Sequence, residues 1–334
     1  MTLNVAILGA GQAGSRHITG FTGIENVRIT AVADANSDLA RREADRCSAT
    51  HFQDWRDALE ASPAPDAVVV ALPHHLHADA ACMAAGRGLH VLMEKPMGST
   101  LAEGRRIEET CDAARVVLMV CFVHRFRDEA IMAKAWIEAG HIGEPVNCLE
   151  TIASPRGSHL GAWVNSLALS GGGALLYTGV HAVDRLLWLV DSPVDNVHAA
   201  TRTLTTASQV EEAVAALLTF DNGAMATFSV TGPTYSAGGT EWRSEIYGTE
   251  GVIRIRARQS VEIAGRNLAQ RIDVANTTTE EGEHYNFKRQ AEAFVRAVRN
   301  QGVSPIPGQY GLRVLELCQK IYDRSRESPD PTLP

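Results

Sequence analysis

Three glycines near the start of the chain have a spacing that suits the binding of a diphosphate. Gly9, Gly11 and Gly14 form the pattern G-x-G-x-x-G directly after a short apolar run. The first permits a tight turn, the second lets the backbone approach a pyrophosphate, and the third lets the next helix pack on the strand. Gln12 and Ala13 would open that helix, whose N–H groups carry partial positive charge. We predict that these five residues bind a dinucleotide; the alternative is an ordinary strand-to-helix turn.

An acidic residue stands where the ribose of such a ligand would lie. Asp34 follows a second apolar run, 29–33, and stands twenty residues beyond Gly14. Its carboxylate can accept a hydrogen bond from a ribose 2′-OH and repel a 2′-phosphate. We therefore expect NAD as the cofactor, with NADP kept open because Arg16 and Asn36 are close in sequence. The alternative is an aspartate that ends a strand without a ligand.

A lysine follows another apolar run. Glu94, Lys95 and Pro96 come directly after residues 89–93. At the carboxyl end of a parallel strand, an ammonium group can polarise a carbonyl or stabilise a developing alkoxide. Pro96 restricts the backbone and can take a cis peptide bond. The alternative is a surface Glu–Lys pair before a turn.

A phenol and an imidazole lie four residues apart after three consecutive glycines. Tyr177 and His181 follow residues 171–173, and on an α-helix this spacing places both on one face. Histidine exchanges protons near neutral pH, whereas a tyrosine, with a reference pKa of about 10, would be helped as an acid by a nearby lysine. The alternative is a core helix in which both side chains are satisfied locally.

Other polar residues could contact a substrate. His124 and Arg125 follow the apolar run 116–121, where they would bind hydroxyl groups or brace a domain junction. A later loop holds a tryptophan among hydrogen-bonding side chains, which suits the apolar face and polar rim of a sugar ring. Its residues are Arg156, His159, Trp163 and Asn165. The alternative is an irregular loop packed by one tryptophan.

A cluster of histidines, His74, His75 and His77, follows Pro73. We predict no metal site, because no cysteine or carboxylate completes a recognisable ligand set. A metal-dependent hydrolase built on this cluster is the weakest alternative function.

Alternating strand and helix patterns in the first third of the chain predict an α/β fold with a doubly wound parallel sheet. Strands are expected at 3–8, 28–33, 66–72, 89–93 and 116–121, and helices at 37–47, 55–61, 77–86 and 101–114, the last opened by a Thr100–Glu103 capping box. Ligands bind such sheets at the carboxyl ends of the strands, which is where the candidate segments up to Arg125 fall.

Successive strand patterns after about residue 122 predict a second domain with a large, mostly antiparallel sheet. Strands are expected at 146–153, 195–204, 213–220, 224–231, 243–248 and 251–264, and helices at 127–139, 175–190, 286–300 and 309–325. Asp221-Asn222-Gly223 is a strong hairpin signal. The predicted domains are 1–122, which binds the dinucleotide, and 123–334.

Composition excludes several classes of function. The 334 residues carry a formal net charge of −8, which argues against a nucleic-acid partner and gives no basic face for a membrane. No stretch approaches the ~20 apolar residues of a membrane-spanning helix, and no signal peptide precedes the first strand. The six scattered cysteines form no C-x-x-C pair and suggest reduced, mostly buried thiols. We expect a cytoplasmic protein of two domains.

In their order along the chain, these motifs resemble the glucose–fructose oxidoreductase / inositol dehydrogenase / MocA (Gfo/Idh/MocA) family. The resemblance rests on the glycine motif, Glu94-Lys95-Pro96, Phe122-Val123-His124-Arg125-Phe126, and Gly179-x-His181-x-x-Asp184. It implies an N-terminal NAD(P)-binding Rossmann domain and a C-terminal α/β domain with a large open sheet. It also implies oxidation or reduction of a sugar, cyclitol or ketosugar, and a homodimer or homotetramer formed through that sheet.

The same resemblance assigns roles to individual residues. Lys95 is implied to be catalytic, His181 to handle the reacting hydroxyl, and Asp184 to bind substrate or orient its neighbours. Three more residues are implied to lie near the cofactor: Pro73, His77 and Glu94.

Tyr177 departs from the family pattern, which is Asp-x-Gly-x-His. Some ketosugar reductases of the family resemble this chain in using a tyrosine as the acid. We expect Lys95 to stabilise the alkoxide, Tyr177 to relay the proton and His181 to orient the hydroxyl, all three converging over a nicotinamide. The alternative function is a non-catalytic dinucleotide-binding sensor or regulatory protein, which the missing aspartate would suit.

Overall fold

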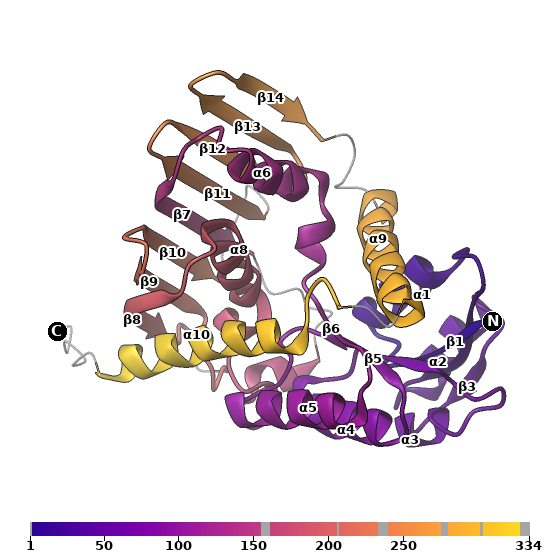
Figure 1. Cartoon of the computed structure of the whole chain (residues 1–334). Coiled ribbons are helices and arrows are strands. Elements are labelled where there is room, and N and C mark those ends of the chain that lie inside the picture. Colours follow the sequence, from indigo (N-terminus) through magenta and orange to yellow (C-terminus); the bar gives the residue numbers. More distant parts are fainter. Residues whose placement is uncertain are drawn as a thin grey trace. The chain divides into compact units, whose positions relative to one another are not determined.

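The chain forms two compact units, each drawn from two segments. Figure 1 shows the computed structural model, which describes residues 2–154, 161–205, 207–232, 240–274, 280–300 and 303–327. Unit 1 comprises Met1–Phe126 and Thr279–Arg313, and unit 2 comprises Arg127–Thr278 and Val314–Pro334. This division differs from a single cut after residue 122, because part of the C-terminal sequence returns to unit 1.

The sheet of unit 1 has six parallel strands in the order β3-β2-β1-β4-β5-β6, the predicted doubly wound arrangement. Its strands are β1 (Leu3–Leu8), β2 (Val27–Ala33), β3 (Thr50–Phe52), β4 (Ala67–Val70), β5 (His90–Glu94) and β6 (Leu118–Cys121). The central strands are apolar and almost wholly buried, as a parallel sheet covered on both faces requires. The edge strand β3 is short and largely exposed, so it has no apolar pattern in the sequence.

The helices of unit 1 pack around this sheet (Figure 1). They are α1 (Gln12–Phe21), α2 (Ser37–Asp45), α3 (Trp55–Ala58), α4 (His77–Gly86), α5 (Leu101–Ala114) and α9 (Glu280–Arg299), with 3-10 turns η1 (His74–Leu76) and η2 (Val123–Phe126). Helix α9 belongs here because it packs on α1, where the rings of Phe21 and Phe294 meet edge to face with centroids 6.4 Å apart. The predicted cap of α5 is confirmed, since Thr100 Oγ1 accepts a hydrogen bond from the Glu103 N–H at 3.2 Å.

The sheet of unit 2 has eight strands in the order β14-β13-β12-β11-β7-β10-β9-β8. Its strands are β7 (Pro145–Ala153), β8 (Val194–Arg202), β9 (Ala213–Phe220), β10 (Met225–Thr231), β11 (Glu241–Gly248), β12 (Gly251–Arg256), β13 (Ser260–Gly265) and β14 (Ala269–Asp273). Only β7 and β10 pair in parallel within these strands. The hairpin predicted at Asp221-Asn222-Gly223 is confirmed. The single strand predicted over 251–264 is wrong, because a turn that holds Arg258 at a φ of 66° divides it into β12 and β13.

One face of this second sheet is covered by helices. Buried and exposed residues alternate along β9 and β10, so that Leu218 and Phe228 face the core while Leu217 is exposed. The helical elements that contribute to unit 2 are α6 (Asp128–Glu138), η3 (Ala162–Asn165), α7 (Leu167–Ser170), a π-helical turn η4 (Leu175–Gly179), α8 (Val180–Val190) and the later part of α10 (Gly308–Glu327). A buried, bidentate ion pair between Arg185 and Glu150 ties α8 to β7, with N–O distances of 3.1 and 2.7 Å.

The six cysteines are all free thiols. Four are buried and two are half-buried, which confirms the predicted mostly buried thiols. Burial raises the pKa of Cys111 and Cys148 to about 12, so both stay protonated at neutral pH. In the part of the chain that the structure describes, no helix has both the length and the apolarity needed to cross a membrane.

Candidate functional site

The steric surroundings differ at each of the three glycines of the first motif. Gly9 has a φ of +98°, and a side chain there would clash with the backbone of Ala71. A side chain on Gly14 would clash with the carbonyl of Gly9, so its absence lets α1 approach β1. Gly11 has nothing within 4 Å of the place where a Cβ would lie. The turn is therefore open at its second glycine, where a pyrophosphate must approach the backbone.

The first turn of α1 begins at this open position. Gln12 is exposed and Ala13 is half-buried, and the turn contains no acidic residue. The partial positive charge of the helix start is therefore not offset by a carboxylate within that turn. Together with the open glycine, this arrangement fits the diphosphate of a dinucleotide.

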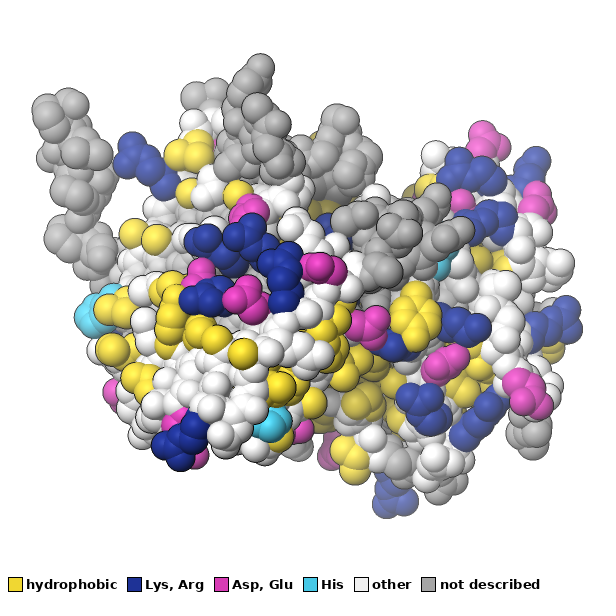
Figure 2. Space-filling model, turned by 90° about the horizontal axis from the view of Figure 1, so that it is seen from above, with side chains coloured by type: hydrophobic (Ala, Val, Ile, Leu, Met, Phe, Trp, Pro, Cys, Tyr) yellow, Lys and Arg dark blue, Asp and Glu magenta, His cyan; other side chains and the backbone are white. Residues whose placement is uncertain are grey.

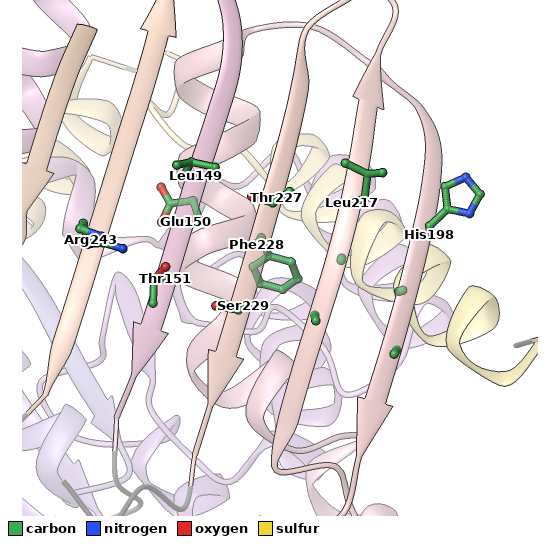
Figure 3. Close-up of a pocket in the computed structure, with 13 residues that line it drawn as sticks. Leu149, Glu150, Thr151, His198, Leu217, Thr227, Phe228, Ser229 and Arg243 are labelled. Carbon is green, nitrogen blue, oxygen red and sulfur yellow. The ribbon is translucent and has the colours of Figure 1, made fainter. Parts of the chain in front are cut away.

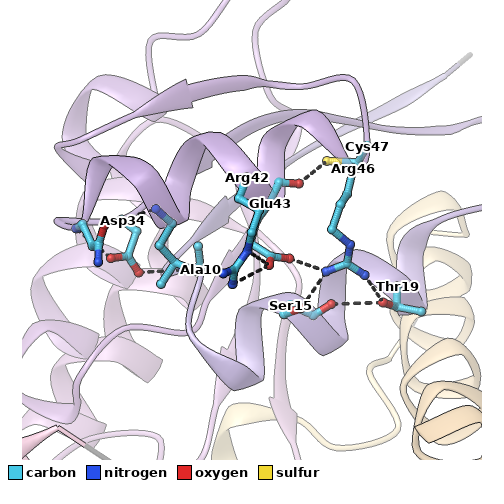
Figure 4. Close-up of polar contacts among 10 residues, drawn as sticks. Ala10, Ser15, Thr19, Asp34, Arg42, Glu43, Arg46 and Cys47 are labelled. Atoms are coloured by element: carbon cyan, nitrogen blue, oxygen red, sulfur yellow. Dashed lines mark hydrogen bonds and ion pairs between the residues drawn. The ribbon is translucent and has the colours of Figure 1, made fainter. Parts of the chain in front are cut away.

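Asp34 supports the same turn from the end of β2. Its Oδ2 accepts a hydrogen bond from the Ala10 N–H at 2.9 Å, and its Oδ1 accepts one from the Asn36 N–H at 2.9 Å (Figure 4). A carboxylate oxygen can accept more than one hydrogen bond, and Asp34 is only half-buried. The residue can therefore hold the turn and also accept a hydrogen bond from a ribose hydroxyl.

Helices α1 and α2 are tied together beside this turn. Arg46, at the end of α2, donates to Ser15 Oγ at 2.7 Å and to Thr19 Oγ1 at 3.0 Å, and it also pairs with Glu43 (Figure 4). These contacts fix the helix that starts at the glycine turn against the helix that follows Asp34.

His77 and Pro73 lie after β4, where they were expected to approach the cofactor. His77 is fully buried, with Nδ1 2.9 Å from the Pro96 carbonyl and Nε2 2.8 Å from the Leu72 carbonyl. Burial lowers the pKa of His77, although the two carbonyls oppose this shift. Because both ring nitrogens face backbone atoms, His77 joins the segments after β4 and β5. Pro73 is half-buried at the start of η1.

Lys95 follows β5 and is supported by a buried carboxylate. Glu94 Oε1 accepts a hydrogen bond from His17 Nε2 at 2.8 Å, and Glu94 Oε2 accepts one from the Lys95 backbone N–H at 3.1 Å. Burial alone would raise the pKa of Glu94, but the His17 hydrogen bond and the Lys95 charge outweigh it and hold that pKa below its usual range. The Lys95–Pro96 peptide bond is cis, as the sequence allowed.

Burial lowers the pKa of the Lys95 ammonium, while the negative charge of Glu94 opposes that shift. The amine is thus held at the carboxyl edge of a parallel sheet with a proton that it loses more readily than a free lysine does. His17 was not among the predicted site residues. A single histidine on an amphipathic helix carries no pattern that separates it from an ordinary core residue.

Both ring nitrogens of His77 lie within 2.9 Å of backbone carbonyl oxygens, which leaves neither of them directed toward the other histidines of the 74–77 cluster. Among the residues that the structure describes, His17, Glu94 and Cys121 bring potential ligand atoms within 4.8 Å of one another. His17 and Glu94 are already hydrogen-bonded, and burial raises the pKa of Cys121 well above its usual value. The trio forms a buried polar cluster that joins α1 to the carboxyl ends of β5 and β6.

His124 and Arg125 lie in η2, directly after β6. His124 is buried, and the Arg125 guanidinium stacks over the Tyr310 ring at 4.1 Å from its centroid. This cation–π contact within unit 1 fixes the arginine side chain at the end of the sheet.

Tyr177 lies in the π-helical turn η4, immediately before α8. A π-turn contains i→i+5 hydrogen bonds and places more residues in each turn than an α-helix does. Residues four apart still lie about one turn apart in such a segment, so the shared face of Tyr177 and His181 stays a prediction. Tyr177 is half-buried, and its backbone N–H donates to the Gly173 carbonyl at 2.9 Å.

His181 and Asp184 lie in the first turns of α8. His181 is 5% exposed and its ring stands 5.8 Å from the Trp242 ring, centroid to centroid. Asp184 is fully buried one turn later, beside Arg185. Both polar residues are thus held rigidly on a helix that the Arg185–Glu150 ion pair anchors.

Trp163 and Asn165 lie in η3, and both are half-buried. The Asn165 carbonyl accepts a hydrogen bond from the Gln209 N–H at 2.9 Å. The other two predicted residues of this loop, Arg156 and His159, lie outside the described residues.

Comparison with known proteins identifies the family. Residues 3–122 match the family described as "Oxidoreductase family, NAD-binding Rossmann fold", and residues 131–254 match the "GFO/IDH/MocA C-terminal domain". The rhizopine catabolism protein MocA of Rhizobium meliloti is 30% identical over 257 residues, which cover 75% of this chain and 78% of that protein. The chain belongs to the Gfo/Idh/MocA family of oxidoreductases.

This Gfo/Idh/MocA protein is also similar to the scyllo-inositol 2-dehydrogenase (NAD(+)) of Bacillus subtilis (strain 168). The two are 27% identical over 310 residues, which cover 90% of this chain and 87% of that protein. Among solved structures, a levoglucosan dehydrogenase in complex with NADH has the same fold, with a TM-score of 0.88, 24% identity, and coverage of 98% and 97% of the two chains. The predicted fold class and the assignment as an NAD(P)-dependent oxidoreductase are confirmed.

Proposed function

We propose that this Gfo/Idh/MocA protein transfers a hydride between the nicotinamide of NAD and a carbon atom of a sugar, cyclitol or ketosugar. The observation that carries the proposal is the open turn at Gly11 beside Asp34, in a sheet that also presents Lys95 at a strand end. The substrate class is supported by the scyllo-inositol 2-dehydrogenase named above and by a levoglucosan dehydrogenase of Pseudarthrobacter phenanthrenivorans that is 31% identical over 207 residues.

The glycine turn and the first turn of α1 would hold the diphosphate, and Asp34 would hold the adenosine ribose. The segments that His77 joins, which carry Pro73 and Lys95, would face the nicotinamide end. When bound, the cofactor supplies the hydride acceptor in oxidation and the hydride donor in reduction. Asp34 favours NAD over NADP because its carboxylate would repel a 2′-phosphate.

Three side chains divide the remaining chemistry in this proposal. In oxidation, the substrate hydroxyl gives its proton to a relay through Tyr177. The carbon that bears this hydroxyl loses a hydride to the nicotinamide, so that a carbonyl forms. Lys95 stabilises the negative charge on the substrate oxygen, and His181 orients the hydroxyl. Reduction reverses each of these movements.

Substrate hydroxyl groups would be bound by residues from both parts of the sequence. We assign this role to His124, Arg125, Arg156, Trp163, Asn165 and Asp184. The tryptophan would offer an apolar surface to one face of a sugar ring, and the others would offer hydrogen bonds to its rim.

Two copies of the chain would associate through the uncovered face of the unit 2 sheet. Figure 3 views that sheet around a shallow depression of about 550 Å³, lined in part by Leu149, Leu217 and Thr227, and helices lie behind the strands. Leu217 and Met225 are 42% and 45% exposed. Figure 2 shows hydrophobic side chains gathered beside intermixed basic and acidic ones on the face seen from above. An apolar area rimmed by charge favours a homodimer or homotetramer.

The six free thiols suit a reducing compartment such as the cytoplasm.

A panel assay tests the proposed reaction. The purified protein is mixed with NAD or NADP and a set of sugars and cyclitols, and in the reverse direction with NADH and ketosugars, while absorbance of the reduced nicotinamide is followed. We expect turnover with at least one substrate, with NAD preferred. Tight NAD binding without turnover across the panel would instead support a dinucleotide sensor, a second candidate that is favoured by tyrosine at position 177 in place of the family's aspartate.

A further inference from the structure

The three glycines before Tyr177 mark a crowded point in unit 2. Gly171 has a φ of +75°, which ends α7 in a left-handed conformation. A side chain on Gly172 would clash with the hydroxyl group of Tyr322 on α10. The glycine run therefore lets a second helix bring a polar group against the start of the segment that carries Tyr177.

A buried carboxylate holds the backbone at this point. Glu211 Oε2 accepts a hydrogen bond from the Gly173 N–H at 2.9 Å, and Oε1 accepts one from the Leu175 N–H at 2.9 Å. The backbone carbonyl of the same residue accepts the Ala174 N–H at 2.8 Å. One glutamate thus receives three consecutive N–H groups at the start of a helical segment, where negative charge is favourable.

Tyr322 completes the arrangement from α10. Its hydroxyl donates a hydrogen bond to Glu211 Oε1 at 2.9 Å. Burial and the negative charge of Glu211 raise the pKa of Tyr322 well above its usual value, so the hydroxyl remains a donor. The glutamate is consequently fixed on one side by a phenol and on the other by the backbone that it holds.

The position of Tyr177 follows from these contacts. The Tyr177 N–H donates a hydrogen bond to the Gly173 carbonyl, and the Gly173 N–H donates one to Glu211 Oε2. The π-turn Leu175–Gly179, an uncommon conformation that is frequent at functional sites, begins at Leu175, whose N–H donates to Glu211 Oε1. Glu211 therefore holds the backbone at the residue where the π-turn that contains Tyr177 begins.

We propose that Glu211 is a positioning residue that acts through Tyr177, with Tyr322 as the partner that fixes its carboxylate. This inference rests on the proposed function, because it takes Tyr177 as the proton relay. Glu211 has no sequence signal of its own, since it lies 34 residues after Tyr177 in a connection between strands.

The neighbouring residue offers a matched control. Glu212 is also buried, and its Oε2 accepts the Leu204 N–H at 2.8 Å and the Thr205 N–H at 2.7 Å. Glu211→Gln and Glu212→Gln thus make the same chemical change to adjacent buried carboxylates that each hold two backbone N–H groups. Only the first of them holds the segment that carries Tyr177.

A double-mutant cycle tests the inference with kcat as the readout. We expect Glu211→Gln to lower kcat at least about tenfold in the wild-type background and less than about twofold in a Tyr177→Phe background, because neighbours that act as one unit are not additive. Glu212→Gln should lower kcat less than about twofold in both backgrounds, and the Kd for NADH should stay within about twofold throughout. If Glu211→Gln fails to fold, Tyr322→Phe, which keeps both backbone hydrogen bonds, carries the same cycle with an expected loss of about threefold.

The outcomes separate this inference from the proposed function. The positioning role would be overturned if Glu211→Gln lowered kcat by the same factor in both backgrounds. It would also be overturned if Glu211→Gln and Glu212→Gln lowered kcat equally. Neither result would remove Tyr177 as the proton relay. A Tyr177→Phe variant with wild-type kcat would instead remove Tyr177 from the proposed mechanism, and the positioning role would fall with it.

Discussion

The backbone N–H of Ala10 donates a hydrogen bond to Oδ2 of Asp34 at 2.9 Å. This contact joins the middle of the glycine turn to the end of the next strand. The acidic residue expected to contact the ribose therefore also shapes the turn expected to hold the diphosphate. Cofactor affinity and cofactor choice should consequently depend on the same side chain.

Asp34→Asn should reduce both affinity for NADH and discrimination against NADPH. The amide keeps one oxygen acceptor but turns an NH₂ group toward a backbone N–H, and it no longer repels a 2′-phosphate. We expect the Kd for NADPH divided by the Kd for NADH to fall about tenfold or more. Both constants are measured by quenching of protein fluorescence. Asp38→Asn, in the first turn of α2, is the control and should leave the ratio unchanged. An unaltered ratio in Asp34→Asn would contradict the role of this carboxylate.

Lys95→Ala should lower kcat at least about a hundredfold while the Kd for NADH changes less than about threefold, because the ammonium acts on charge that develops in the transition state. Lys95 has a pKa lowered by burial, so its charged form is lost as pH rises through a value below the ordinary 10.5. The wild-type kcat should therefore fall on an alkaline limb that lies below pH 10.5. Lys95→Arg, whose guanidinium does not titrate in this range, should lack that limb. An identical alkaline limb in Lys95→Arg would assign it to another group.

His17→Phe should make the protein more sensitive to acid. The His17 hydrogen bond holds the pKa of Glu94 low against the effect of burial. A carboxyl group with a lowered folded-state pKa stabilises the fold above the unfolded-state value, about 4.3, and loses that contribution as pH falls through the folded-state pKa. Without His17, the midpoint of acid unfolding should move to higher pH, and the free energy of unfolding at pH 7 should fall by about 1–3 kcal/mol. In a Glu94→Gln background, His17→Phe should leave the acid midpoint in place; a shift there would point to some other group.

Arg185→Met should destabilise unit 2 by about 3–5 kcal/mol, because it leaves the Glu150 carboxylate buried without its cation. Replacing both residues by methionine should recover most of that loss. The measurement is urea unfolding followed by circular dichroism. The control Arg271→Met removes the exposed pair with Asp273 and should change stability by less than about 0.5 kcal/mol. A double variant as unstable as Arg185→Met alone would mean that the arginine acts through packing.

Leu217→Asp should dissociate the proposed homo-oligomer, because it places a charge among the apolar side chains of the uncovered sheet face. Light scattering during gel filtration should report the monomer mass for this variant and a multiple of it for the wild type. Val303→Asp changes an 88% exposed residue of unit 1 and should not alter the mass. A wild-type mass equal to that of one chain would remove the assembly.

The sequence predicts the local framework of the molecule because the relevant signals are periodic or adjacent. Apolar runs give the buried parallel strands, and the glycine spacing gives the first turn. The turn at Asp221-Asn222-Gly223 depends on residues whose backbone preferences are strong by themselves. The cis bond before Pro96 belongs to the same class, since only proline makes it readily accessible.

Long-range partners could not be predicted in this way. His17 and Glu94 are 77 residues apart, and Glu211 and Tyr322 are 111 apart, yet each pair forms a buried hydrogen bond. No periodicity links such residues, because the fold alone brings them together. The π-turn at Tyr177 could not be predicted from the sequence either, since its residues would also suit an α-helix. For the same reason the return of α9 to α1 could not be read from the chain.

Hydride transfer to NAD is tested most directly with a substrate that carries deuterium on the reacting carbon. The wild-type protein is incubated with NAD and deuterated members of the sugar and cyclitol panel. The reduced cofactor is then isolated, and its molecular mass is measured by mass spectrometry. We predict reduced cofactor that contains one deuterium atom, formed at least about a hundredfold more slowly by Lys95→Ala. Reduced cofactor without deuterium, or none at all despite saturated binding of NAD, would contradict an oxidoreductase that acts on these substrates.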